Sequence, residues 1–202
     1  MAHRFIENGR IAAGLSAQQY HQILVEQAGA TEDGLDEEAA EKLQFTQLNL
    51  HRTNRITRTF KVGDDLAALL KGINTPQTWM LLTEPWCGDS AQCLPYISAL
   101  AALNHNIDLR LILRDENLDL MDDFLTNGTR SIPRLVIFDQ DGNELTQWGP
   151  RPKEAQAVFM EAKNAGLQKP EILEKLHLFY GRNRGAALID ELRELISELV
   201  GS

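Results

Sequence analysis

Cys87 is the residue of this sequence best placed for chemistry, because it lies where a strand-like run gives way to a helix-like one. The apolar residues 79–82 precede it, and residues 91–103 follow with apolar side chains at helical spacing. The first turn of a helix has unpaired N–H groups and the positive end of the helix dipole, and both favour a thiolate. Such a position can lower the pKa of a cysteine from about 8.5 to roughly 3.5–7.5. Position alone leaves two possibilities: Cys87 is a nucleophile, or it is a small cysteine that only packs at the start of a helix.

The second cysteine, Cys93, lies too far along the same predicted helix to pair readily with Cys87. A disulfide needs Cα atoms within about 7 Å of each other. Six residues of ideal helix rise about 9 Å and turn roughly 240°, which leaves the two cysteines on different sides of the helix. Cys93 is expected to pack as a small hydrophobe and to act as a second thiol only if the helix start unwinds. The position about 5 Å from Cys87 is occupied by Ser90, so the sequence predicts single-cysteine chemistry.

Asp89 follows the nucleophile in the first turn of this helix. Its negative charge suits the helix dipole but opposes a thiolate at Cys87, so two effects compete at the sulfur. Asp89 is either a carboxylate that stabilises the helix start or a functional group that accepts a proton or selects a cationic substrate.

A second motif, Ser131-Ile132-Pro133, comes just before the strand-like residues 135–138. Together with Trp86-Cys87-Gly88 after a strand, this motif resembles the thioredoxin-like superfamily. The string of residues 84–92 is similar to that of a bacterial branch with one cysteine in its motif and helical terminal extensions. Thioredoxins place a cis-proline opposite the reactive cysteine, so the resemblance implies a cis Pro133 and an Ile132 backbone that pairs with an extended substrate. The alternative is a trans-proline at the start of an edge strand.

The resemblance covers approximately residues 55–165 and implies an α/β fold of the thioredoxin-like type. We expect a central mixed β-sheet flanked by helices. Residues 1–54 are expected to form an N-terminal helical extension, and residues 166–202 a C-terminal helical extension packed on the same domain.

Several side chains around the two motifs are predicted to shape the site. Trp86 is expected to shield the thiol and to offer an apolar contact. Arg130 and Arg134 flank the proline loop and either stabilise a thiolate or grip an acidic substrate, unless they are solvated loop residues. Thioredoxins also keep a buried acid on the strand before the nucleophile, and this chain has Leu81 at the matching position.

Two further segments, Arg114-Asp115 and residues 148–152, follow predicted strands, where α/β sheets tend to place functional groups. A local ion pair and a turn explain them equally well.

The periodicity of apolar residues, with turn and capping signals, predicts the remaining elements. A period of two at residues 55–62 indicates an edge strand, and Asp141-Gly142 indicates a hairpin turn. Helices are expected over residues 16–30, 36–51, 64–71, 91–103, 117–126, 152–164, 170–180 and 185–200, and strands over 55–62, 77–83, 107–113, 134–139 and 144–148.

Composition sets the broad class. The chain has 202 residues, 43% of them hydrophobic, and a formal charge of −9. This charge argues against nucleic acid or an anionic membrane as a partner. No apolar run is long enough for a signal peptide or a membrane helix, and a cytoplasmic location is expected. No metal site and no cofactor are predicted.

The leading functional hypothesis is a thiol-disulfide oxidoreductase or thiol-transfer protein in which Cys87 forms a mixed disulfide that an external thiol resolves. Its partners would be protein or small-molecule thiols and disulfides, and the chain would be a monomer or a homodimer. Alternatives are peroxide or sulfenic acid chemistry at Cys87, a glutathione-dependent iron–sulfur carrier, and an interaction module that makes little use of the thiol.

Overall fold

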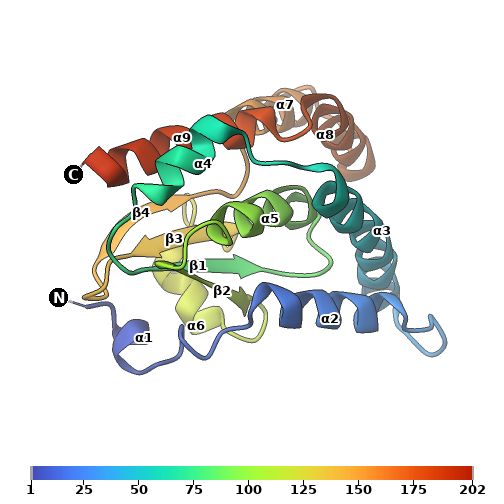
Figure 1. Cartoon of the computed structure of the whole chain (residues 1–202). Coiled ribbons are helices and arrows are strands. Elements are labelled where there is room, and N and C mark those ends of the chain that lie inside the picture. The colour runs from blue at the N-terminus through green and yellow to red at the C-terminus, as the bar shows by residue number, and fades with distance from the viewer. Residues whose placement is uncertain (1, 202) are drawn as a thin grey trace.

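A four-stranded mixed β-sheet lies at the centre of the computed structural model, which describes residues 2–201 (Figure 1). Its strands have the order β2-β1-β3-β4. β1 runs parallel to β2 and antiparallel to β3, and β4 runs antiparallel to β3. The sheet and its flanking helices form the predicted α/β thioredoxin-like fold. The strands are β1 (Gln77–Thr83), β2 (Ile107–Leu113), β3 (Arg134–Phe138) and β4 (Glu144–Trp148).

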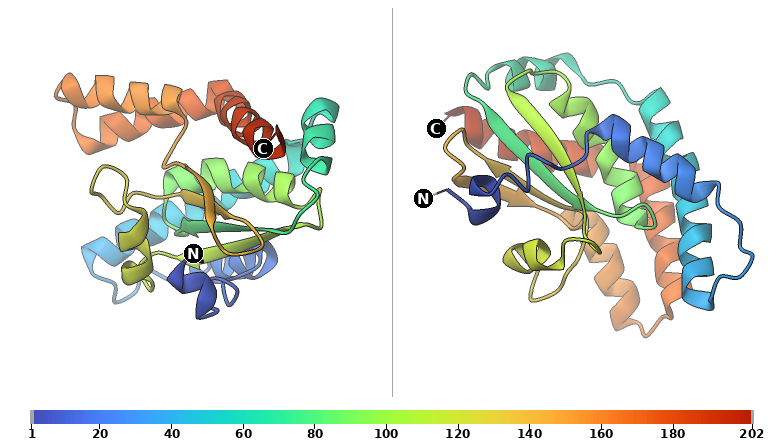
Figure 2. Two further views of the ribbon diagram at one scale, coloured as in Figure 1. Left: turned by 90° about the vertical axis from the view of Figure 1, so that its left-hand side faces the viewer. Right: turned by 90° about the horizontal axis from the view of Figure 1, so that it is seen from below.

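Helices cover both faces of this sheet (Figure 2). One face carries α2, α3, α4, α5, α7, α8 and α9, and the opposite face carries α1 and α6. The helices are α1 (Arg4–Glu7), α2 (Ala17–Ala28), α3 (Glu37–Thr59), α4 (Asp64–Lys71), α5 (Gly88–Ala101), α6 (Leu118–Met121), α7 (Lys153–Asn164), α8 (Lys169–Asn183) and α9 (Ala186–Gly201).

The central strand β1 is buried on both sides, as its continuous apolar character predicts. Trp79 and Leu81 pack into the larger core, under α5 and the terminal helices. Met80 and Leu82 point to the other face and pack against α1 and α6. Because successive strand residues face opposite ways, one short strand joins the two cores.

Local signals set the starts of the N-terminal helices. The Ser16 hydroxyl accepts a hydrogen bond from the Gln19 N–H, and the Gln19 side chain accepts one from the Ser16 N–H. Asp36 caps α3 by accepting a hydrogen bond from the Ala39 N–H at 2.8 Å. Both caps satisfy N–H groups that the helix itself leaves unpaired.

The edge strand predicted over residues 55–62 is wrong. Helix α3 continues through this stretch to Thr59, across the predicted boundary between residues 54 and 55. Asn49, Thr53 and Ile56 are all buried, with spacings of four and three residues, so this stretch follows the helical period and not the period of two. The chain leaves the helix only at Phe60, whose ring packs edge-on against Tyr96 with 4.6 Å between centroids.

Other boundaries differ less. The hairpin between β3 and β4 forms as predicted, and Asp139 accepts hydrogen bonds from the N–H groups of Asp141 and Asn143 in its turn. The helix expected over residues 117–126 is limited to α6 and a 3₁₀ turn at Asp122–Phe124. Among residues 2–201, no helix has both the length and the apolar character needed to cross a membrane.

Candidate functional site

Cys87 lies at the junction between β1 and α5, where it is the N-cap residue of the helix. Its Sγ accepts a hydrogen bond from the Ser90 N–H at 3.5 Å and donates one to the Ile132 carbonyl at 3.4 Å. The side chain is largely buried, with 8% of its surface exposed, and packs in the core cluster that contains Met80 and Leu82. The thiol is therefore held by both predicted motifs, 45 residues apart in the sequence.

Burial reverses the effect that the helix start has on this thiol. Burial, and after it the charge of the nearby Asp89 carboxylate, raise the pKa of Cys87 to about 11. The Ser90 hydroxyl and the N–H groups of Ser90 and Asp89 act in the opposite direction but do not offset it. The expectation that the helix start lowers the pKa of Cys87 is therefore wrong, and the thiol is protonated at neutral pH.

Asp89 forms a largely buried ion pair with Arg151. Its Oδ2 accepts hydrogen bonds from the Arg151 guanidinium at 2.6 and 3.0 Å, and its Oδ1 accepts one from the Tyr180 hydroxyl at 2.5 Å. The side chains of the ion pair are only 14% and 11% exposed. Asp89 therefore joins the start of α5 both to α8 and to the segment that follows β4.

The proline loop lies directly over the thiol. The peptide bond between Ile132 and Pro133 is cis, and so is the one between Gly149 and Pro150. At Gly149, which has φ +118°, an added Cβ would lie 2.2 Å from the Pro133 carbonyl oxygen. Only glycine allows these two backbones to approach so closely, and this contact places Arg151 within reach of Asp89.

The two arginines predicted beside this loop make contacts elsewhere. Arg130 is exposed and pairs with Asp122 at 2.7 Å. Arg134 donates hydrogen bonds to the Gly149 carbonyl and to the Gln147 side chain.

Trp86 lines the same cleft as Cys87, and two cations lie against its ring. The guanidinium of Arg114 lies 4.9 Å from the centre of the Trp86 ring, and the ammonium group of Lys42 lies 5.7 Å from it. Arg114 also pairs with Asp115 at 2.5 Å. Such stacking of cations on an indole ring orders the aromatic side chain.

A cleft of about 510 Å³ opens over Cys87. Its floor consists of residues 86–89 with Ser131 and Ile132, and its two walls are α3 and α8. Apolar side chains from the walls are Phe45, Leu173 and Leu176. Both terminal helical segments therefore build the entrance to the thiol.

Three polar side chains near the thiol were missed by the sequence analysis. On α8, His177 lines the cleft, and burial and the charge of Arg52 lower its pKa to about 4. A Cβ added at Gly88 would lie 3.4 Å from His177 and 3.7 Å from Arg52. Buried Glu84 accepts a hydrogen bond from the Asp115 N–H at 2.7 Å, and burial raises its pKa to about 7. Glu84 lies inside the cysteine motif, which was the only signal for it; nothing local in the sequence indicates Arg52 or His177.

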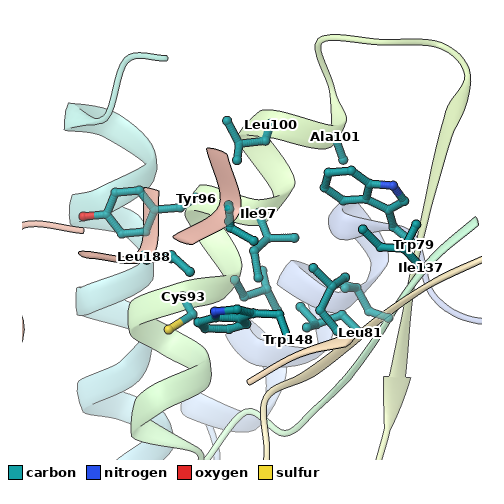
Figure 3. Packing of buried hydrophobic residues seen from close by; sticks show 14 of the residues in the cluster. Trp79, Leu81, Cys93, Tyr96, Ile97, Leu100, Ala101, Ile137, Trp148 and Leu188 are labelled. Carbon is teal, nitrogen blue, oxygen red and sulfur yellow. The ribbon is translucent and has the colours of Figure 1, made fainter. Parts of the chain in front are cut away.

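Cys93 is fully buried in the larger core, which also contains Tyr96 and Trp148 (Figure 3). Cys87 belongs to the other core cluster, and both cysteines are free thiols. Ser90, the other predicted site residue on α5, is also buried, with 1% of its surface exposed. Within residues 2–201, His, Cys, Asp and Glu side chains form no group of three that could hold a metal ion.

Comparisons with known proteins agree with this geometry. The family described as thioredoxin matches residues 37–164 of this chain. No curated protein matches it significantly. A crystal structure of a protein of unknown function from Pseudomonas aeruginosa is similar, with a TM-score of 0.50 and 18% identity, over 85% of this chain and 99% of the other. An HIV epitope-scaffold has a TM-score of 0.52 and 16% identity, over 88% and 94% of the two chains.

Proposed function

Because the chain belongs to the thioredoxin family, we propose that it is a thiol-disulfide exchange protein that uses Cys87 as its single nucleophile. The observation that carries this proposal is the position of the Cys87 thiol, which lies on the floor of a cleft and 3.4 Å from the Ile132 carbonyl. Cys93 lies in a separate core cluster, so the exchange does not use it as a resolving thiol.

The reaction has two steps. The Cys87 sulfur attacks one sulfur of a substrate disulfide, a new S–S bond forms to Cys87, and the substrate bond breaks to release a thiol. The proton lost by Cys87 ends on the departing sulfur, directly or through solvent. An external small thiol then attacks the mixed disulfide, takes over the substrate sulfur as a new disulfide, and returns Cys87 to the reduced form.

The cleft walls indicate which substrates fit. Each of the four cations that line the cleft is paired with a carboxylate: Lys42 with Glu38, Arg114 with Asp115, Arg151 with Asp89 and Lys169 with Glu41. The remaining lining includes Phe45, Trp86, Leu173 and Leu176, which are apolar. We therefore infer a substrate with apolar side chains beside its disulfide, such as an extended protein segment, in preference to a strongly charged small molecule.

The raised pKa of Cys87 favours a second candidate function, a thioredoxin-fold interaction module in which the cleft binds a partner segment without redox chemistry. Both functions use the same cleft, and they differ in whether a covalent bond to the sulfur forms.

The test is turnover of a disulfide-bonded peptide in the presence of excess small thiol. With an apolar peptide, we expect activity in wild type and in Cys93→Ser, none in Cys87→Ser, and slower reaction with a peptide whose flanking residues are charged. Equal rates in wild type and Cys87→Ser, with the peptide still bound, would favour the interaction module.

A further inference from the structure

A second cavity lies behind the thiol cleft, with Tyr180 between them. Tyr180 lines both spaces, and its hydroxyl donates to Asp89 on the side of the thiol. The second cavity has a volume of about 630 Å³, in the range of sites for small organic ligands. It is enclosed by the end of α3, by α5, and by the turn between α8 and α9.

The rim of this cavity carries positive charge without a counter-charge. Arg55, Lys61 and Arg184 line it, and no aspartate or glutamate among residues 2–201 does. None of the three cations forms an ion pair with another residue in the range 2–201. This differs from the thiol cleft, where every lining cation is paired, and it stands out in a chain with a net charge of −9.

The floor of the cavity offers neutral hydrogen-bond donors. Gln92 and Tyr96, both on α5, are 6% and 5% exposed. Within the described part of the chain, neither the Gln92 amide nor the Tyr96 hydroxyl makes a hydrogen bond to protein, while both side chains line the cavity. The polar ends of both side chains are accessible from the cavity, so they are available to donate hydrogen bonds to a ligand there.

The turn between α8 and α9 is shaped to complete this space. Arg184 and Gly185 both have left-handed backbone conformations, with φ of 52° and +86°. A Cβ added at Gly185 would lie 2.4 Å from the Tyr96 ring. Glycine therefore lets the turn pack directly on Tyr96, and the preceding Arg184 is brought to the rim.

We propose that this cavity binds a small molecule that carries a phosphate or diphosphate group. The guanidinium groups of Arg55 and Arg184 and the ammonium group of Lys61 neutralise its charge, and charge-assisted hydrogen bonds from arginine to phosphate oxygens are strong. The Gln92 amide and the Tyr96 hydroxyl donate to its remaining oxygens from the floor. The site is independent of thiol chemistry at Cys87.

The test is calorimetric titration of the full chain with inorganic pyrophosphate at fixed ionic strength. We expect one site per chain, and about tenfold weaker binding in each of Arg55→Gln and Lys61→Gln, because each loses one charged hydrogen bond. Arg58→Gln is the matched control: it removes the same charge from the same helix but does not line the cavity. Its affinity should stay within about twofold of wild type.

Two further readouts locate the site and separate it from the proposed function. The side-chain amide signals of Gln92 should shift in NMR spectra on addition of pyrophosphate, and Cys87→Ser should bind as tightly as wild type. The proposal is overturned if pyrophosphate does not bind, if Arg58→Gln weakens binding as much as Arg55→Gln, or if citrate binds with equal affinity.

Discussion

Asp89→Asn should make the thiol of Cys87 more reactive. The pKa of Cys87 is raised from its ordinary 9.0 to about 11, first by burial and second by the charge of Asp89. A thiol with a pKa of about 11 is only about one-thousandth thiolate at pH 8, and each unit of pKa changes this fraction tenfold. Removing the charge leaves the burial in place, so we expect the rate of alkylation at pH 8 to rise about tenfold and still to increase with pH above it.

The assay is the pH dependence of iodoacetamide alkylation in a Cys93→Ser background, followed by mass spectrometry of the Cys87 peptide. Asp190→Asn is the control, because it also removes one carboxylate from an ion pair but lies on the exposed surface of α9. It should leave the alkylation profile unchanged. An unchanged or slower rate in Asp89→Asn, with the fold intact by circular dichroism, would refute the assignment of Asp89 as a group that suppresses the thiolate.

Three more substitutions test the surroundings of the site through urea unfolding. Arg151→Met leaves the largely buried Asp89 charge without its partner and should cost about 3 kcal/mol of unfolding free energy. Arg193→Met, which breaks an exposed ion pair, should cost less than about 1 kcal/mol. Equal costs would mean that burial does not strengthen the pair between Asp89 and Arg151. Gly149→Ala should cost about 3 kcal/mol or more of unfolding free energy, because the added Cβ would collide with the Pro133 carbonyl. Gly9→Ala, where φ is positive but the surrounding space is open, should cost only about 1–2 kcal/mol. A similar loss in both would mean that the contact between Gly149 and Pro133 is unimportant for stability. The pKa of Glu84 is raised from 4.5 to about 7, so the folded state holds this proton more tightly than the unfolded state, and the stability that the proton contributes is lost as pH rises from about 4.5 to 7. Glu84→Gln should therefore flatten the dependence of the unfolding free energy on pH in that window. An unaltered dependence would contradict the raised pKa.

The sequence carries enough local information for the sheet and for the two motifs of the site. Residues 79–82 are apolar on both faces of a strand, and this is what a central strand requires. The thioredoxin-like resemblance implies that the motif with Cys87 faces the motif with Pro133, and a hydrogen bond from the Cys87 sulfur to the Ile132 carbonyl joins the two. The cap at Asp36 can be predicted from the sequence because a cap depends only on residues three positions away.

The rest of the site depends on contacts between distant segments. Arg151 and Tyr180 both contact Asp89, although they follow it by 62 and 91 positions in the sequence. No spacing rule predicts contacts between residues so far apart. The same holds for Arg52 and His177 at the start of α5. The pKa of Cys87 is raised, although the position at a helix start predicts a lowered one. Desolvation causes this difference, and it depends on how deeply the packed helices bury the sulfur, which a short motif does not encode.

Intact-mass analysis after exposure to a disulfide-bonded peptide tests the central claim most directly. Wild type, Cys93→Ser and Cys87→Ser are incubated with the peptide at pH 8 without added thiol, quenched with acid, and weighed. The single-nucleophile account predicts one adduct in wild type and Cys93→Ser, heavier by the half-peptide that stays bonded to the sulfur and mapped to Cys87, and none in Cys87→Ser. An adduct that maps to Cys93, an internal disulfide between the two cysteines, or no adduct in any of the three proteins would contradict it.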